Sequence, residues 1–306
     1  MTNTLAVVFP GQGSQSVGML RGIAAKYPSV QETFAEASQV LGYDLWQLVQ
    51  QGPVEQLNQT VYTQPALLTA SYAIWKVLQT TSSIEPAMLA GHSLGEYSAL
   101  VCAGALKFSD AVKLVAARGQ YMQEAVSAEE GAMAAIIGLD DASIISICEK
   151  AAHSADEVIS PANYNSIGQV VVAGHLAPVE RAIILAKEQG AKLAMLIPVS
   201  VPSHCVLMRP AADRLQVQLA DVALQMPTIP VVSNVEARPY ENAAAIRAGL
   251  IKQLYSPVLW VSIVQYFIQS GIKTVIECGP GKVLTGLNKR IDTHLDLLTT
   301  ADTLGV

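Results

Sequence analysis

One short stretch, residues 87–100, limits what this chain can fold into more than any other. It reads AMLAGHSLGEYSAL, an apolar strand pattern followed at once by a helical pattern. Between the two, Gly91-His92-Ser93-Leu94-Gly95 fits G-x-S-x-G, the pattern of a nucleophile elbow. Side chains in place of the two glycines would crowd such a turn, and its strain lifts the serine hydroxyl out of the backbone. The next helix would point its first N–H groups at whatever Ser93 attacks. The alternative is a plain structural turn.

The segments on either side of this stretch alternate between strand and helix patterns. Apolar runs predict strands over residues 5–9, 87–90, 229–233 and 274–277. Helical spacing predicts helices over residues 19–26, 29–41, 63–78, 109–124, 206–219, 243–255 and 259–270, with a short one starting at 53. Thr63, and Ser109 with Asp110, are placed to cap two of these helices. Because strands that alternate with helices form a largely parallel sheet covered on both sides, we expect an α/β fold.

The pattern changes between residues 128 and 198. Strands are predicted over 132–139, 157–164, 169–173 and 192–197, with helices over 140–152 and 178–189. Asp140 and Asp141 are placed to cap the first of these helices. The order βαββαβ is that of the ferredoxin-like motif. We therefore expect a large α/β-hydrolase-like domain with a mostly parallel sheet, formed by residues 1–127 and 199–306, and a small ferredoxin-like domain inserted at 128–198.

Composition argues against several classes of protein. The chain has 306 residues, of which 51% are hydrophobic, and a formal net charge of −6, so nucleic-acid binding is not expected as its main activity. It contains no apolar run of the roughly 18 residues that a membrane helix needs. The apolar run 5–9 is too short for the core of a signal peptide. Its four cysteines are scattered without a C-x-x-C pair, which favours reduced thiols in the cytoplasm over disulfides or a metal site.

A serine nucleophile needs a base within hydrogen-bonding reach, and the chain has five histidines to supply one. His92 adjoins Ser93, but neighbours on a tight turn usually point apart. His153 and His294 have the pattern of solvated positions, and His175 lies in a turn after a strand. His204 lies at the expected junction of the two domains, where binding sites are common. It is therefore the candidate base; the alternative is a residue at a helix start that bonds to the backbone.

Arg118 is the second candidate for a functional residue. Its flanks are small and apolar, and no acidic residue lies three or four positions away. Arginine is seldom buried without a partner, so either the partner is distant in sequence or an anion from a ligand completes the site. A guanidinium binds a carboxylate through two parallel hydrogen bonds. The alternative is an arginine whose side chain reaches out to solvent along its helix.

Several short motifs come in one order along nearly the whole chain. They are Gly11-Gln12-Gly13-Ser14-Gln15, Gln64-Pro65-Ala66, Gly91-His92-Ser93-Leu94-Gly95-Glu96, Arg118-Gly119, Asn163-Tyr164-Asn165-Ser166, Ser203-His204 and Gly279-Pro280-Gly281. In this order and spacing the sequence resembles the malonyl-CoA:acyl-carrier-protein transacylases of bacterial type II fatty-acid synthesis. The large α/β domain with a ferredoxin-like insert is also what this resemblance implies.

The resemblance implies a role for each matching residue. Ser93 would form a malonyl ester, with His204 as the base and the main-chain carbonyl of Gln253 orienting that histidine. Backbone N–H groups of Gln12 and Leu94 would hold the oxyanion. The substrate site would contain the residues around the malonyl group and the cleft, namely Arg118 as the carboxylate-binding group, Gln64, His92, Met122, Asn163 and Asn165. The pocket volume around Ser203 and Met122 would decide between malonyl and methylmalonyl groups.

The implied partners are malonyl-CoA and an acyl carrier protein. No metal or other cofactor is expected, since the coenzyme A thioester is itself the substrate, and neither nucleic acid nor membrane is an expected partner of what should be a cytoplasmic monomer. The carrier is expected to be acidic, so basic side chains would have to bind it, and the candidates are Lys187, Lys192, Lys282, Lys289 and Arg290. Two alternatives stay open: a serine thioesterase or other hydrolase, and a non-catalytic protein that docks the carrier.

Overall fold

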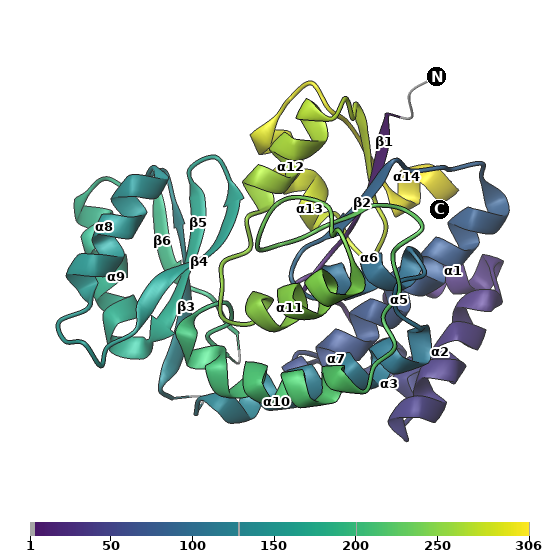
Figure 1. Ribbon diagram of the computed structural model, residues 1–306, viewed down its shortest axis with the longest axis horizontal. Coiled ribbons are helices and arrows are strands. Elements are labelled where there is room, and N and C mark those ends of the chain that lie inside the picture. The colour runs from purple at the N-terminus through teal and green to yellow at the C-terminus, as the bar shows by residue number, and fades with distance from the viewer. Residues whose placement is uncertain (1–3, 128, 200, 306) are drawn as a thin grey trace.

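A computed structural model describes residues 4–127, 129–199 and 201–305 and contains two separate sheets (Figure 1). The larger sheet has the order β7-β2-β1-β8-β9, and all its neighbours pair in parallel. Its strands are β1 (Leu5–Phe9), β2 (Met88–Gly91), β7 (Val231–Val232), β8 (Thr274–Glu277) and β9 (Asp296–Thr299). The predicted α/β fold class is therefore confirmed.

Helices cover both faces of the parallel sheet, and the alternation of side chains along β1 shows why. Val7 and Phe9 point into a large core that also contains residues of α5 (Thr60–Thr81), α6 (Gly95–Cys102) and α7 (Phe108–Ala125). Ala6 and Val8 point the other way, into a core with α12 (Trp260–Gln269) and α13 (Val283–Ile291). Each large apolar side chain buried in this way stabilises the fold by about 1.5–3 kcal/mol.

The remaining helices of this part of the chain surround the larger core. They are α1 (Arg21–Lys26), α2 (Ser29–Leu41), α3 (Leu45–Gln51), α4 (Val54–Leu57), the short 3₁₀ helix η1 (Val206–Met208), α10 (Arg209–Ala220), α11 (Ala243–Gln253) and α14 (Thr300–Leu304). Of the helices in the described residues, none is long and apolar enough to cross a membrane.

The second sheet is antiparallel and forms the left-hand part of the molecule in Figure 1, where α8 and α9 cover one of its faces. Its strands are β3 (Gly131–Ile137), β4 (Ile159–Ser166), β5 (Gln169–His175) and β6 (Leu193–Leu196), in the order β4-β5-β3-β6. With α8 (Asp141–Ala151) and α9 (Leu176–Glu188) they follow the predicted βαββαβ order. The domain boundaries stay a prediction, and Ala128, the first residue of the expected insert, lies outside the described residues.

Several predictions of detail differ from the structure. Helix α5 begins at Thr60, so Thr63 is inside it, and its hydroxyl donates to the carbonyl of Leu57 at 2.6 Å instead of capping the helix. Helix α7 begins at Phe108, before Ser109 and Asp110, and no side chain caps it. Strand β9 was not predicted. The cap at Asp140 is confirmed, because its carboxylate accepts from the N–H of Ser143 at 2.7 Å.

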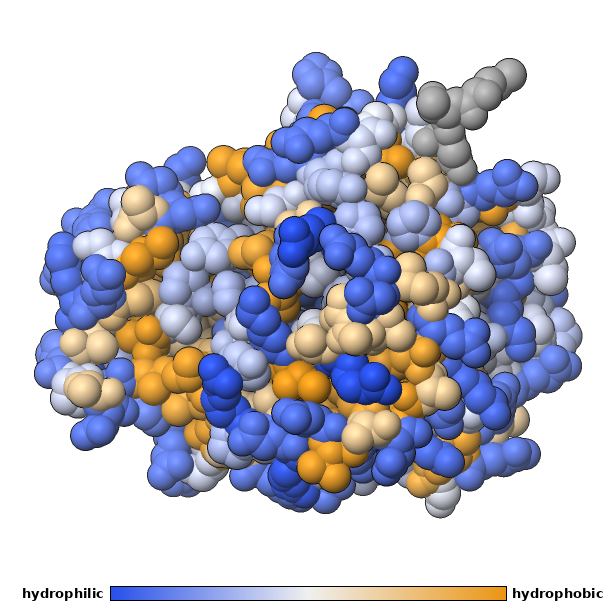
Figure 2. Space-filling view, in the orientation of Figure 1, coloured by the Kyte–Doolittle hydropathy of each residue, from blue (hydrophilic) through white to orange (hydrophobic). Residues whose placement is uncertain are grey.

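Polar and apolar residues are mixed on the surface. Figure 2 shows hydrophilic residues spread over the visible face, with apolar residues in small groups between them. The more exposed large apolar side chains of the described residues include Ile167, Val206 and Val217. These three come from different elements, whereas Leu193, Met195 and Leu196 are exposed apolar residues of one strand, β6.

Candidate active site

The predicted elbow is present at the carboxyl end of β2. Strand β2 ends at Gly91, Ser93 has a φ of 51°, and α6 begins at Gly95. A Cβ on Gly91 would lie 1.9 Å from the carbonyl carbon of Gly95, and a Cβ on Gly95 would lie 2.0 Å from the carbonyl oxygen of Phe9. Only glycine fits at both positions, so the spacing of the motif is a packing requirement of the strand–helix contact.

The strained backbone of Ser93 is held by Asn234, which follows β7. The Asn234 Oδ1 atom accepts from the N–H of Ser93 at 2.7 Å, and its Nδ2 atom donates to the carbonyl of Gly91 at 2.6 Å. No motif in the sequence predicts a role for Asn234. Its one available signal was its place just after a predicted strand of the parallel sheet, where the strand ends meet at one edge.

The imidazole of His204 lies against the Ser93 hydroxyl. Its Nε2 atom is 2.8 Å from Ser93 Oγ, and its Nδ1 atom is 2.8 Å from the carbonyl oxygen of Gln253. Because that carbonyl can only accept, Nδ1 carries the proton and Nε2 presents its lone pair to the hydroxyl. Burial, together with the nearby Arg118 cation, lowers the pKa of His204 to about 3, so the imidazole is neutral at pH 7. This arrangement can take the proton of Ser93.

The guanidinium of Arg118 is fully buried behind the serine, so the alternative of a solvent-exposed arginine was wrong. Its Nη1 atom donates to Gln64 Oε1 at 2.8 Å, and its Nη2 atom donates to Gln253 Oε1 at 2.9 Å and to Ser93 Oγ at 3.3 Å. Its partners are distant in sequence, as one of the two open readings required, and all three are neutral. Among the described residues it forms no ion pair with a carboxylate.

The position of Arg118 depends on the close approach of α5 and α7. The next residue, Gly119, faces α5 so closely that a Cβ there would lie 2.7 Å from the carbonyl oxygen of Thr60. Gln64, which bonds Arg118 on one side, donates from its Nε2 atom to the sulfur of Met122 at 3.5 Å on the other. Helices α5 and α7 therefore bring Gln64, Arg118 and Met122 together in the buried wall behind Ser93.

A cleft of about 190 Å³ opens in front of Ser93 and His204, between the two sheets. The parallel-sheet part contributes Gln12, His92 and Leu284, and the antiparallel sheet contributes residues of β3, β4 and β5. The lining residues from the second sheet include Met133, Asn163, Asn165 and Val171, and Ser203 lies next to His204. The predicted site at the junction of the two parts is thus where the structure has its cleft.

Side chains join the two parts across this cleft. His92 Nε2 lies 2.8 Å from Asn165 Oδ1, and its ring packs at 5.5 Å from the ring of Trp260. Beside them, the backbone of β4 pairs with the segment after α11, where Val258 donates to the carbonyl of Ala162 at 2.9 Å. Burial lowers the pKa of His92, which favours the neutral imidazole in this bridge.

Most backbone N–H groups of the elbow donate hydrogen bonds within the protein. His92 donates to Phe9, Ser93 to Asn234, Gly95 to His92 and Glu96 to Ser93. Among the described residues, the N–H of Leu94 has no protein acceptor. Gln12, the other predicted oxyanion donor, lines the cleft on the loop after β1, and its side chain donates to Thr60 Oγ1 at 3.1 Å.

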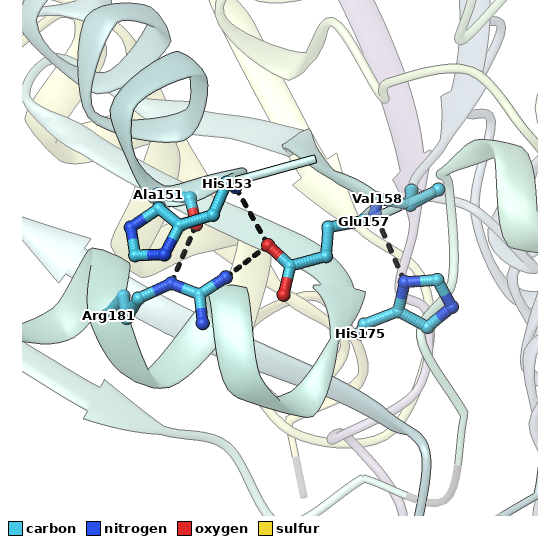
Figure 3. Close-up of polar contacts among 6 residues, drawn as sticks. All are labelled: Ala151, His153, Glu157, Val158, His175 and Arg181. Atoms are coloured by element: carbon cyan, nitrogen blue, oxygen red, sulfur yellow. Dashed lines mark hydrogen bonds and ion pairs between the residues drawn. The ribbon is translucent and has the colours of Figure 1, made fainter. Parts of the chain in front are cut away.

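The other histidines lie outside the cleft. Figure 3 shows His153 and His175 in the antiparallel-sheet part, where the His153 N–H donates to Glu157 at 2.8 Å and the Val158 N–H donates to His175 Nδ1 at 3.0 Å. Glu157 also forms an ion pair with Arg181. These contacts hold the loop between α8 and β4. His294 is exposed, and none of the three histidines meets Ser93.

A buried carboxylate that was not predicted from the sequence lies below the elbow. Glu96, one helical turn after Ser93, is fully buried, and its oxygens accept from Tyr240, Asn234 and Gln253. The side chain of Gln253, of which only the carbonyl was predicted to take part, joins this carboxylate to Arg118 and donates to the carbonyl of Ser93 at 2.9 Å. Glu96 belongs to the same short motif as Ser93, but nothing in a linear sequence says that its side chain turns inward.

An elbow serine, a neutral histidine held by a carbonyl and a buried guanidinium define an α/β protein built for acyl transfer. The chain belongs to the acyl transferase family, whose acyl transferase domain matches residues 6–294. More particularly, it is 60% identical to the malonyl CoA-acyl carrier protein transacylase of Escherichia coli (strain K12), over 96% of this chain and 94% of that protein.

Solved structures show the same similarity. A malonyl CoA-acyl carrier protein transacylase from Coxiella burnetii matches with a TM-score of 0.96 and 54% identity, over 99% of this chain and 95% of that one. A malonyl-transacylase in complex with a type II PKS acyl-carrier protein also matches with a TM-score of 0.96, at 52% identity, over 99% of this chain and 98% of that one.

Proposed function

We propose that this chain transfers the malonyl group from malonyl-CoA to the phosphopantetheine thiol of an acyl carrier protein, through a malonyl ester on Ser93. The choice of malonyl as the acyl group rests on the Arg118 guanidinium. It is buried, its Nη2 atom lies 3.3 Å from Ser93 Oγ, and all its hydrogen-bond partners are neutral. A carboxylate two bonds beyond the reacting carbonyl carbon would meet this cation. The names of the relatives, which act on malonyl CoA and acyl carrier protein, agree with it.

In the first half-reaction, Ser93 Oγ forms a bond to the thioester carbon while His204 Nε2 takes its proton. The N–H groups of Leu94 and Gln12 are proposed to stabilise the oxyanion; each such donor is worth on the order of 10²–10³ in rate. The carbon–sulfur bond then breaks, and His204 returns the proton to the sulfur of coenzyme A. In the second half-reaction the carrier thiol loses its proton to His204, and its sulfur forms a bond to the ester carbon. The bond between that carbon and Ser93 Oγ then breaks, and His204 returns the proton to Oγ. Each bond change is balanced without a metal or redox group.

Both thiols have to enter the same cleft, so the carrier docks near its mouth. Lys282, Lys289 and Arg290 flank or belong to α13, which contributes Val283, Leu284 and Leu287 to the lining. They are exposed and favoured by position for an acidic carrier, whereas Lys187 and Lys192 lie on α9 and in the turn before β6 and line no part of the cleft. We also propose a cytoplasmic monomer, with four free cysteines as the support for that compartment.

The test is acyl-enzyme formation. The protein is incubated with malonyl-CoA or acetyl-CoA, and the intact mass is followed with time. We expect a malonyl adduct that the Ser93→Ala variant does not form, and we expect Arg118→Ala to lose malonylation by roughly 10²-fold more than acetylation, because a desolvated charge pair is lost.

Three results would contradict the proposal. A folded wild-type protein that acquires no adduct would favour the non-catalytic docking protein. An adduct that persists in Ser93→Ala would exclude Ser93 as the nucleophile. Equal losses of malonyl and acetyl transfer in Arg118→Ala would favour a hydrolase without carboxylate recognition.

A further inference from the structure

Glu96 is a buried acid that the proposed chemistry does not use. It lies in the first turn of α6 with no exposed surface. One carboxylate oxygen accepts from the Tyr240 hydroxyl at 2.6 Å and from the Asn234 N–H at 3.1 Å, and the other accepts from Gln253 Nε2 at 2.5 Å. A buried carboxylate is costly, and here three donors directed at it offset that cost. A carboxylate kept buried below the nucleophile by three dedicated donors is therefore a candidate for a functional role.

The function follows from what Arg118 lacks. A fully buried guanidinium needs a counter-charge, yet its hydrogen bonds all go to neutral oxygens, on Gln64, Gln253 and Ser93. The side-chain amide of Gln253 connects Glu96 to this guanidinium: its Oε1 atom accepts from Arg118, and its Nε2 atom donates to Glu96. The electrostatic interaction between Glu96 and Arg118 favours the charged form of each.

We propose that Glu96 is a positioning residue for carboxylate recognition: acting through the Gln253 side chain, it balances the charge of Arg118 and fixes the direction of its guanidinium. The inference rests on the proposed function, since it concerns the selection of malonyl over uncharged acyl groups. The polarity of the chain of groups supports it, because a carboxylate can only accept. Gln253 must therefore present its N–H to Glu96 and its oxygen to Arg118.

Replacing this carboxylate by an amide creates a conflict. The side chain of a Glu96→Gln variant would turn its NH₂ group either toward the N–H of Asn234 or toward Gln253 Nε2, and both are donors. In the second case Gln253 would rotate and direct N–H groups at Arg118. In either case the charge is lost. The guanidinium would lose part of its orientation, which matters for an acyl group with a carboxylate and little for one without.

The pH dependence gives a second readout. The titratable or charged groups around Glu96 are Tyr240 from the loop before α11, Arg118 from α7 and Tyr97 from α6 itself. Burial raises the pKa of Glu96 to about 7, and the pKa of Tyr97 is raised to about 12. Glu96 is therefore the member of this group that changes charge near neutrality. The ratio of malonyl to acetyl transfer isolates it, because both acyl groups use the same Ser93 and His204.

The experiment measures the kcat/KM of Ser93 acylation with malonyl-CoA and acetyl-CoA between pH 6 and pH 8.5. We expect the wild-type ratio to fall as the pH drops through about 7. Glu96→Gln should lower the ratio roughly ten-fold at pH 8, the loss expected for one buried charged hydrogen bond, and should remove its pH dependence. Tyr240→Phe removes a hydrogen bond that lowers the pKa of Glu96, so it should move the midpoint of the fall to higher pH.

The matched control is Glu277→Gln. Glu277 is the other buried glutamate among the described residues, and it accepts from Leu284 and Thr285 at the start of α13, away from Arg118. This variant should keep the wild-type ratio and its pH dependence even if both rates fall. A Glu96→Gln ratio that equals or exceeds the wild-type ratio would overturn the inference. The proposed function would survive that result, because its own tests are malonylation of the wild-type protein and the behaviour of the Ser93→Ala and Arg118→Ala variants.

Discussion

The buried neutral imidazole of His204 makes a prediction about stability that does not depend on any substrate. Folding lowers the pKa of this group from 6.5 to about 3, first through burial and then through the Arg118 cation. At pH 5 the unfolded chain binds a proton here and the folded protein does not. Acidification from pH 7.5 to pH 5 therefore lowers the free energy of the unfolded state by about 2 kcal/mol relative to that of the folded state. The contribution of a neutral His204 to stability is complete above the unfolded pKa and is lost as the pH falls toward the folded pKa.

The perturbation is His204→Asn. The residue has a φ of 64°, a left-handed conformation that asparagine tolerates better than other non-glycine residues. Its amide N–H can also replace the Nδ1 proton that meets the Gln253 carbonyl. The variant thus keeps the local backbone and one hydrogen bond, and it has no group that titrates.

The assay is urea unfolding at pH 7.5 and pH 5 at constant ionic strength, for wild type and variant. We expect the free energy of unfolding of the wild type to fall by about 2 kcal/mol more than that of His204→Asn between the two pH values. Other acids, Glu96 included, are common to both proteins and cancel in the difference. Equal changes in the two proteins would mean that the folded imidazole titrates near its ordinary pKa, and the lowering of its pKa by burial and by Arg118 would be refuted.

Three further changes test other parts of the structure. Asn234→Ala leaves the Ser93 N–H and the Gly91 carbonyl without partners, so the free energy of unfolding in urea should fall by about 2 kcal/mol. No fall would mean that Asn234 is not needed to stabilise the elbow. Gly119→Ala should separate α5 from α7 and reduce malonylation on the order of 10-fold more than acetylation, and an unchanged ratio would contradict the placement of Arg118. Asp140→Ala removes a helix cap and should cost about 1 kcal/mol in thermal unfolding while the malonylation rate stays unchanged; a change in that rate would contradict a purely structural role.

Local patterns predicted most of the fold. Strands 5–9 and 274–277 and helix 29–41 have the predicted bounds, because each has a strong apolar pattern with a turn residue at its end. The strand predicted over 229–233 shrinks to Val231–Val232, since Pro230 has no N–H to donate to the sheet. Strand β9 escaped prediction because it is a short edge strand whose residues alternate between partly buried and exposed.

The site was predictable where a residue type is unusual for its surroundings, and not where it depends on pairing across the sheet. Arg118 has an apolar environment in the sequence itself. Asn234 meets Ser93 only because β7 pairs with β2, which brings together residues 141 positions apart. Neither the composition nor the spacing of the segment around Asn234 contains that pairing.

The neutral surroundings of Arg118 make sense for a group that has to receive a carboxylate. A glutamate in direct contact with the guanidinium would compete with the malonyl group, and each binding event would have to break a buried ion pair. Acceptors on Gln64 and Gln253 satisfy part of the guanidinium and leave its Nε without a protein partner among the described residues. Glu96 supplies the balancing charge from behind the Gln253 amide, where it stabilises the cation without occupying the place of the substrate. The cation is thus oriented before the substrate arrives, and the binding energy of the malonyl carboxylate need not be spent on ordering the site.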